Sequence, residues 1–264
     1  MKTAIIIPAR YSSVRFPGKP LVKLSVGKGL QKSLIQLSWE AACRVKNVEH
    51  IVVATDDERI RTEAESFGAK VVMTSKKCRN GTERCAEASK NINFNGDLIV
   101  NLQGDAPLTP EWFVEDLIET FKKDPDTQMA TPVLRLDKDS LNSFRLDRKS
   151  GRVGGTTVVF DNNNNALYFS KEIIPFFDEK RLMQGEACPI FHHVGVYAYR
   201  PEILSKYHTW KESNLEALEG LEQLRFLENR CAIKCVLVDS KGRTFWELNN
   251  PEDVMKIENA IRKI

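Results

Sequence analysis

Short apolar runs alternate with stretches of helical spacing from residue 1 to about residue 136. A short apolar run bounded by proline or glycine is typical of a buried strand, whereas apolar residues three and four positions apart indicate a helix. The predicted strands are TAIIIPA, HIVVATDD, KVVMT and DLIVNLQGD, and the predicted helices are Leu30–Val45, ERIRTEAESFGA, TERCAEASKNI and TPEWFVEDLIETFKK. Because strands and helices alternate, this part predicts a parallel sheet covered by helices.

The pattern changes after about residue 137. TTVVFDNNNNALYFS contains two strand-like runs joined by an Asn-rich turn, and HHVGVYAYR has the alternation of a third strand. LEALEGLEQLRFLENR then predicts one long helix, IKCVLVDS a strand and NPEDVMKIENAIRKI a closing helix. We expect a single domain over residues 1–264: an α/β portion over about 1–136, an antiparallel lobe over about 137–215, and a segment over 216–264 that returns to the core.

Composition narrows the class of protein without naming a function. The net charge of +3 over 264 residues is too small to indicate a nucleic-acid or membrane surface. No apolar stretch reaches the roughly 18–20 residues needed to span a bilayer, and the N-terminal run is too short for a secretory signal. We therefore expect a cytoplasmic protein without a nucleic-acid or membrane partner. The cysteines match no zinc-binding spacing and predict reduced thiols; they are Cys43, Cys78, Cys85, Cys188, Cys231 and Cys235.

The loop after the first predicted strand carries three cations, Arg10, Arg15 and Lys19. In open α/β folds such a loop lies beside the ligand crevice. The loop is not a P-loop, because Ser13 stands where that motif needs glycine and Pro20 where it needs serine or threonine. Three cations at this place favour a side-chain clamp on a polyanion such as a triphosphate. A merely solvated charged loop is the alternative.

A second candidate stretch, NLQGDAPL, ends the most apolar predicted strand and places Asp105 at the carboxyl edge of the sheet. Magnesium is usually bound by one or two carboxylates together with phosphate oxygens. Asp105 is therefore a candidate magnesium ligand beside the cationic loop, although aspartate after glycine is also a common turn residue.

These stretches belong to a longer series of motifs. The series is IPARYSSVRFPGKPL, VATDD, NGTER, NLQGDAP, ALYFSKEIIPF, HHVGVYAYR, LEGLEQLRFLE and NNPEDV. In order and spacing it resembles the 3-deoxy-manno-octulosonate (Kdo) cytidylyltransferases, also called CMP-Kdo synthetases, over nearly the whole chain. The resemblance implies a nucleotidyltransferase-type α/β fold, with a mixed sheet and a smaller antiparallel lobe for sugar binding and dimerisation. It also implies a homodimer and Mg²⁺-dependent transfer of CMP from CTP to the sugar acid, giving a donor for lipopolysaccharide or capsule synthesis.

The resemblance also implies roles for matching residues. Arg10, Arg15 and Lys19 would bind the CTP phosphates, with Lys19 nearest the charge that develops as pyrophosphate leaves. Gln103 would contact the cytidine side, and Asp105 would bind metal. The implied sugar-acid pocket consists of Arg84, His193, Tyr197, Glu222 and Gln223.

The chain departs from the family's pattern at two places. The family usually has a second metal-binding aspartate near the C-terminus, and this chain has Asn249 there, which offers a carbonyl oxygen but no charge. Near the predicted nucleotide and sugar sites, Ser75, Cys78 and Asn80 stand where the family has other residues. The preferred acid is therefore open between Kdo and a relative such as 8-amino-Kdo or another 2-keto sugar acid. A non-catalytic nucleotide or sugar binder is the alternative from a different class.

Overall fold

The structure is a computed structural model that describes residues 1–12, 16–152, 155–178, 180, 182 and 185–263. Within these ranges, ten strands form one mixed sheet and two form a separate hairpin. The strands are β1 (Thr3–Ala9), β2 (Lys23–Gly27), β3 (Leu30–Ser33), β4 (His50–Thr55), β5 (Lys70–Met73), β6 (Leu98–Leu102), β7 (Met129–Arg135), β8 (Thr156–Phe160), β9 (Ala166–Ser170), β10 (Phe191–His193), β11 (Val196–Tyr199) and β12 (Ile233–Val238).

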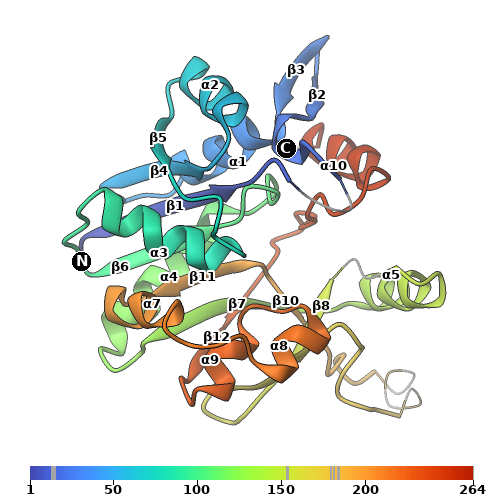
Figure 1. The fold of residues 1–264 in the computed structure, drawn as a ribbon. Helices are drawn as coiled ribbons and strands as arrows, with labels where there is room; N and C mark the ends of the chain where they lie inside the picture. The colour runs from blue at the N-terminus through green and yellow to red at the C-terminus, as the bar shows by residue number, and fades with distance from the viewer. Residues whose placement is uncertain (13–15, 153–154, 179, 181, 183–184, 264) are drawn as a thin grey trace.

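Helices cover both faces of the sheet (Figure 1). The helices of the described ranges are η1 (Lys19–Leu21), α1 (Leu34–Cys43), α2 (Glu58–Ser66), α3 (Gly81–Asn91), α4 (Glu111–Lys123), α5 (Lys138–Lys149), α7 (Pro201–Tyr207), α8 (Asn214–Glu219), α9 (Leu224–Glu228) and α10 (Asp253–Ile261); α5 projects from the lobe, and α10 packs on the β2–β3 hairpin. None of the helices in the described ranges is long and apolar enough to cross a membrane.

The predicted parallel sheet is present in the first half of the chain. Strands β5, β4, β1 and β6 lie side by side in that order, and every pair is parallel. Successive side chains of a strand point to opposite faces. Accordingly, Ile5 and Ile7 pack with α1, α2 and α4, whereas Ile6 packs with α3 on the other face. The continuous apolar sequence of β1 thus reflects burial on both faces.

The strand predicted from HHVGVYAYR is broken, and the break joins the two parts of the sheet. β10 pairs with β7 and β8 of the lobe, whereas β11 pairs with β6 and β7. Between them, the Thr131 hydroxyl donates to the carbonyl oxygens of Val194 (3.1 Å) and Val196 (2.8 Å). Gly195 at the break is therefore free to donate its N–H outside the sheet.

The Asn-rich hairpin of the lobe forms as predicted between β8 and β9. Asp161 Oδ1 accepts the N–H groups of Asn163 (2.9 Å) and Asn165 (2.8 Å), and Asn164 adopts a left-handed conformation with φ of 59°. Asparagine tolerates this conformation better than most residues, which explains the composition of the turn.

Two further expectations about local structure are wrong. Residues 30–33 form the second strand of a hairpin with β2, so α1 begins at Leu34 and not at Leu30. The long helix predicted over residues 215–230 is two short helices, α8 and α9. Gly220 ends α8 in a left-handed conformation with φ of 62°, which glycine adopts without steric cost. The turn that follows leads into the cavity described next.

Candidate active site

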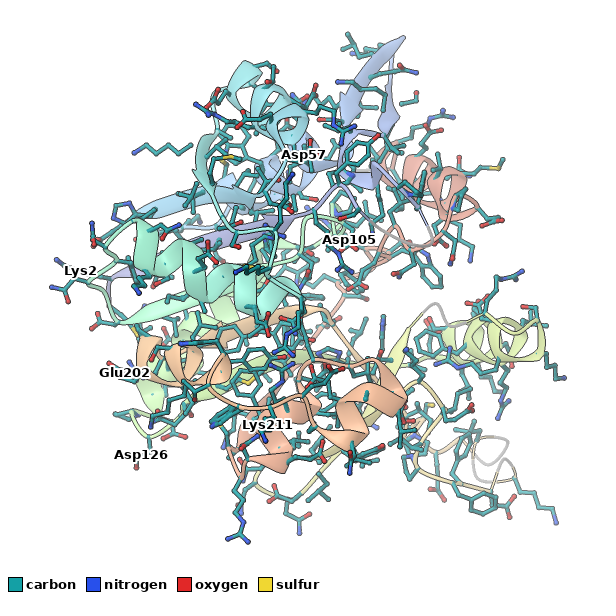
Figure 2. All side chains as sticks on the ribbon, viewed as in Figure 1. Lys2, Asp57, Asp105, Asp126, Glu202 and Lys211 are labelled. Carbon is teal, nitrogen blue, oxygen red and sulfur yellow. The ribbon has the colours of Figure 1, made fainter. Side chains whose placement is uncertain are left out.

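A cavity of about 370 Å³ lies between the carboxyl ends of β1 and β6 and the lobe. Its walls come from the loops after these two strands, the start of α3, the β10–β11 break, the turn between α8 and α9, and residues 247–249. Figure 2 shows Asp105 near the middle of the molecule, whereas Lys2, Asp126 and Glu202 lie at its periphery. The cavity brings together Arg10, Lys19, Arg84, Gln103, Asp105, His193, Tyr197, Glu222, Gln223 and Asn249, which are the predicted site residues except Arg15.

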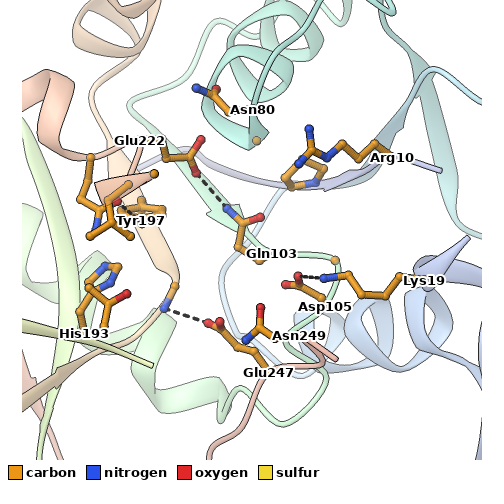
Figure 3. A pocket seen from close by; sticks show the side chains of 18 of the residues that line it. Arg10, Lys19, Asn80, Gln103, Asp105, His193, Tyr197, Glu222, Glu247 and Asn249 are labelled. Atoms are coloured by element: carbon orange, nitrogen blue, oxygen red, sulfur yellow. Dashed lines mark hydrogen bonds and ion pairs between the residues drawn. The ribbon is translucent and has the colours of Figure 1, made fainter. Parts of the chain in front are cut away.

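Lys19 and Asp105 form an ion pair at one end of this cavity (Figure 3). The position of Lys19 depends on Gly18, which has φ of 70° and donates its N–H to the Tyr11 carbonyl (2.9 Å). Arg10 is exposed at the cavity and donates from Nη1 to the Arg79 carbonyl (3.1 Å). Arg15 lies outside the described residues, so its role stays a prediction.

The loops after β1 and β6 are held together by close backbone packing. A Cβ atom at Gly104 would lie 2.8 Å from the Pro8 carbonyl oxygen, so a larger residue would push the loops apart. The Ser38 hydroxyl donates to the Gly104 carbonyl (3.0 Å) from α1. This contact explains why the cationic loop and Asp105, distant in the sequence, share one cavity.

The other end of the cavity contains uncharged polar side chains and the half-buried carboxyl group of Glu222, and Arg84 and Lys171 also line the cavity. Glu222 accepts the Thr82 N–H (3.1 Å) and a hydrogen bond from the Gln103 side chain (3.3 Å). Burial raises the pKa of Glu222 above its usual value. The Tyr197 hydroxyl donates to Gln223 Oε1 (3.1 Å).

Two buried nitrogen atoms at this end have no hydrogen-bond partner among the described residues. They are Nε2 of His193 and Nε2 of Gln223. Burial, with a smaller contribution from His192, lowers the pKa of His193 to about 3, so its ring is neutral. Buried polar atoms are normally hydrogen-bonded, and a ligand rich in hydroxyl groups would satisfy these atoms.

Arg84 lines the cavity but is already engaged. Its guanidinium pairs with Asp56 Oδ1 (3.2 Å) and donates to the Thr74 hydroxyl, and only 3% of its side chain is exposed. A sugar carboxylate would therefore have to compete with Asp56 for this group. The predicted role of Arg84 stays a prediction.

Glu247 is a cavity residue that the sequence analysis missed. The Leu248 N–H donates to the Asp105 carbonyl (2.9 Å), which holds residues 247–249 against the loop after β6. The half-buried Glu247 accepts the Gly195 N–H (3.2 Å) and a hydrogen bond from the Asn249 side chain. Burial and the neighbouring Asp105 raise the pKa of Glu247 to about 7. The sequence offered one signal for Glu247: in an extended segment, residues 247 and 249 lie on the same side, so a site that contains Asn249 would also contain Glu247.

Asp253 holds the chain beyond Asn249. Its Oδ2 accepts the N–H groups of Asn249 (3.0 Å) and Asn250 (2.7 Å), and its Oδ1 accepts from the Trp246 indole (2.8 Å). Asp253 lies in the first turn of the terminal helix α10. It therefore positions Asn249 rather than facing the cavity itself.

The oxygen donors of the cavity suit a magnesium ion. Within the described ranges, no group of three or more His, Cys, Asp or Glu side chains is arranged to hold a metal ion. Asp105 and Glu247 nevertheless provide two carboxylates, and Asn249 provides an amide, at one end of the cavity. Magnesium is typically bound through only one or two carboxylates, with phosphates and waters completing the shell, so this set fits.

The chain is similar over most of its length to known cytidylyltransferases. The cytidylyltransferase family model matches residues 4–234. A protein of Maricaulis maris named 3-deoxy-manno-octulosonate cytidylyltransferase is 42% identical over 261 residues, covering 99% of this chain and 97% of that protein. A protein of a Shewanella species named 8-amino-3,8-dideoxy-manno-octulosonate cytidylyltransferase is 39% identical, with 99% of each chain covered.

A solved structure shows which fold the chain shares. The structure of a CMP:2-keto-3-deoxy-manno-octonic acid synthetase complexed with CTP superposes with a TM-score of 0.82 at 31% sequence identity. The superposition includes 100% of this chain and 99% of the synthetase chain. The expected nucleotidyltransferase-type fold is thereby confirmed. With most of its length matched by the family model and two close full-length relatives, the chain belongs to the cytidylyltransferase family.

Proposed function

We propose that this protein transfers CMP from CTP to the anomeric hydroxyl of Kdo, releasing pyrophosphate. The observation that carries the proposal is how charged and polar side chains are distributed along the candidate active-site cavity. Arg10, Lys19 and Asp105 lie at one end, and Glu222, Tyr197 and His193, which can hydrogen-bond hydroxyl groups, lie at the other, with Gln103 between them (Figure 3). A triphosphate and a sugar acid would thus meet with their reacting atoms in the middle.

The cationic end would bind the triphosphate. Arg10 and Lys19 line the cavity, and Arg15 from the same loop would complete the clamp. Charge-assisted hydrogen bonds from arginine and lysine to phosphate are about twice as strong as neutral ones. Lys19 would oppose the charge that builds on the leaving pyrophosphate, and Gln103 would contact the cytidine side.

We propose that Mg²⁺ is the cofactor, with Asp105 and Asn249 among its ligands. When bound, it would neutralise phosphate charge and orient the α-phosphorus for in-line attack. Asp105 would be free to bind it once Lys19 turns from its carboxylate to the phosphates.

The end of the cavity that contains Glu222 and His193 would bind the sugar acid. Glu222, Gln223, Tyr197 and the unpartnered His193 Nε2 would hydrogen-bond hydroxyl groups, and Arg84 would contact the carboxylate. In-line nucleotidyl transfer needs no covalent nucleophile. Catalysis would come chiefly from positioning the hydroxyl and neutralising charge.

A related acid is the second candidate substrate. Relatives from Shewanella are named for 8-amino-3,8-dideoxy-manno-octulosonate, and they cover as much of this chain as the relative named for Kdo. Pyrophosphate release should be measured with each nucleoside triphosphate and with a panel of acids that includes Kdo, 8-amino-Kdo and a nonulosonate. We expect activity with CTP only, and kcat/KM highest with Kdo. Higher kcat/KM with the 8-amino acid would select the second candidate, and activity with neither would contradict the proposal.

We also propose that the protein is a cytoplasmic homodimer whose product serves lipopolysaccharide or capsule synthesis. The lobe carries exposed apolar side chains at Leu146, Leu167 and Phe176, the last 96% exposed. Burial of such side chains against a second copy would be favourable. Light scattering of the purified protein should give twice the mass of the 30.0 kDa chain, whereas the mass of one chain would contradict the dimer.

A further inference from the structure

The carboxylate of Glu247 occupies a place that packing alone does not explain. Leu248 is fully buried, and the segment's alternation turns Glu247 and Asn249 together toward Asp105 (Figure 3). Glu247 is half-buried, and a carboxylate that is largely withdrawn from water is normally paired with a cation or bound to a metal. Lys19 is the cation here, and it already pairs with Asp105. Two neighbouring carboxylates therefore share one ammonium group.

The fold holds Glu247 at this place firmly. Its Oε1 accepts the Gly195 N–H, which the break between β10 and β11 leaves free. A Cβ atom on Gly195 would meet that oxygen, so a larger residue there would displace the carboxylate from its present position. The other hydrogen bond to Glu247 comes from the Asn249 amide, which carries no charge. These contacts orient the carboxylate without neutralising it.

We propose that Glu247 supplies the second carboxylate for the divalent cation that Asp105 binds. This inference rests on the proposed function, in which a triphosphate enters the cavity and attracts Lys19. Two carboxylates would then face each other without a counter-charge, and their repulsion is strong at a poorly solvated site. A divalent cation between them and the phosphates restores the balance, with Asn249 as a neutral neighbour.

Metal affinity tests the proposal without any turnover. Binding of Mn²⁺, a paramagnetic substitute for Mg²⁺, should be followed by the loss of its free-ion EPR signal. The protein should be saturated with the α,β-methylene analogue of CTP and kept free of sugar acid. Glu247→Gln keeps the size of the side chain and an acceptor for Gly195. The matched control is Glu252→Gln, which removes an exposed carboxylate from the same segment.

We expect Glu247→Gln to weaken Mn²⁺ binding by at least about tenfold, since even outer-shell partners of metal ligands contribute 10–100-fold. Glu252→Gln should bind Mn²⁺ like the unmodified protein. The double variant Glu247→Gln/Asn249→Asp, which moves the carboxylate by two residues, should recover most of the lost affinity. Unchanged Mn²⁺ affinity in Glu247→Gln, or a double variant as weak as Glu247→Gln, would overturn the proposal.

Thermal unfolding separates a metal ligand from a structural residue. Without metal, Glu247→Gln should melt at the same or a higher temperature, because one of two adjacent carboxylates is gone. The stabilisation that Mn²⁺ adds should become smaller. A lower melting temperature without metal, with the Mn²⁺-induced increase unchanged, would indicate a structural role and contradict the proposal. Failure of the proposed function would look different: Mn²⁺ binding would depend on Glu247, yet no CMP-sugar would form.

Discussion

Lys19 is the residue on which the proposed nucleotide chemistry depends most. It lies on a loop and pairs with Asp105, so its loss should affect ligands more than folding. We expect Lys19→Ala to cost roughly 1.5–3 kcal/mol in transition-state binding, or roughly 10–150-fold in kcat/KM for CTP. Lys23→Ala is the control, since Lys23 is exposed and pairs with Glu63 outside the cavity. Equal kcat/KM values for the two variants would remove Lys19 from the phosphate clamp.

Glu222 tests the other end of the cavity. It is tied to Thr82 and Gln103, on the side assigned to the sugar acid. Glu222→Ala should raise KM for the sugar acid by about tenfold, the loss expected for one hydrogen bond to a ligand. KM for CTP should change little. Steady-state kinetics with each substrate varied in turn measure both constants, and a selective rise in the CTP value would mean that the two ends have been exchanged.

At the scale of elements, the turn after α8 determines where Glu222 and Gln223 lie. Gly220→Ala forces a side chain into a left-handed conformation at a cost of about 1–2 kcal/mol. Gly242→Ala is a matched control, because Gly242 has φ of 77° and open space around it, away from the cavity. Both variants should lose similar stability in denaturant titrations. Only Gly220→Ala should also raise KM for the sugar acid; a similar rise in Gly242→Ala would show that the effect is not local.

The elements also show what the sequence alone could predict. The buried strands β1 and β6 were predictable because a continuous apolar run has few other solutions, and their parallel pairing placed Lys19 near Asp105. The break at Gly220 was not predictable, because leucines continue the helical spacing on both sides of it. The left-handed conformation of one residue does not change that spacing. Glu247 was missed for a related reason: its burial depends on the Gly195 break, which is a tertiary feature.

At the scale of the whole molecule, the buried His192, which lies where the sheet meets the lobe, should make the protein sensitive to acid. Burial and nearby Arg148 lower the pKa of His192 to about 4, so the folded state holds this ring neutral. The unfolded chain takes up a proton near pH 6.5. The contribution of His192 to stability should thus be complete above about pH 6.5 and be lost as the pH falls toward about 4, a loss on the order of 3 kcal/mol.

Chemical denaturation at pH 7 and pH 5 measures this decline. His192→Gln should lose less stability between the two pH values than the unmodified protein does, whereas a substitution of the exposed His208 to Gln should not alter the difference. A pH dependence identical in all three proteins would show that the buried ring does not control acid stability.

The central claim is that an anomeric hydroxyl attacks the α-phosphorus of CTP in this cavity. Kdo carrying ¹⁸O at the anomeric hydroxyl should be incubated with the purified protein, CTP and Mg²⁺ in unlabelled water, and the CMP-sugar should be examined by ³¹P NMR, in which ¹⁸O bonded to phosphorus shifts the resonance. The account predicts CMP-Kdo whose phosphorus resonance shows this shift, together with unlabelled pyrophosphate. CMP-Kdo that keeps the label in its mass but shows no shift would mean that another oxygen attacks, and CTP bound without any CMP-sugar would show a binding protein instead of this enzyme.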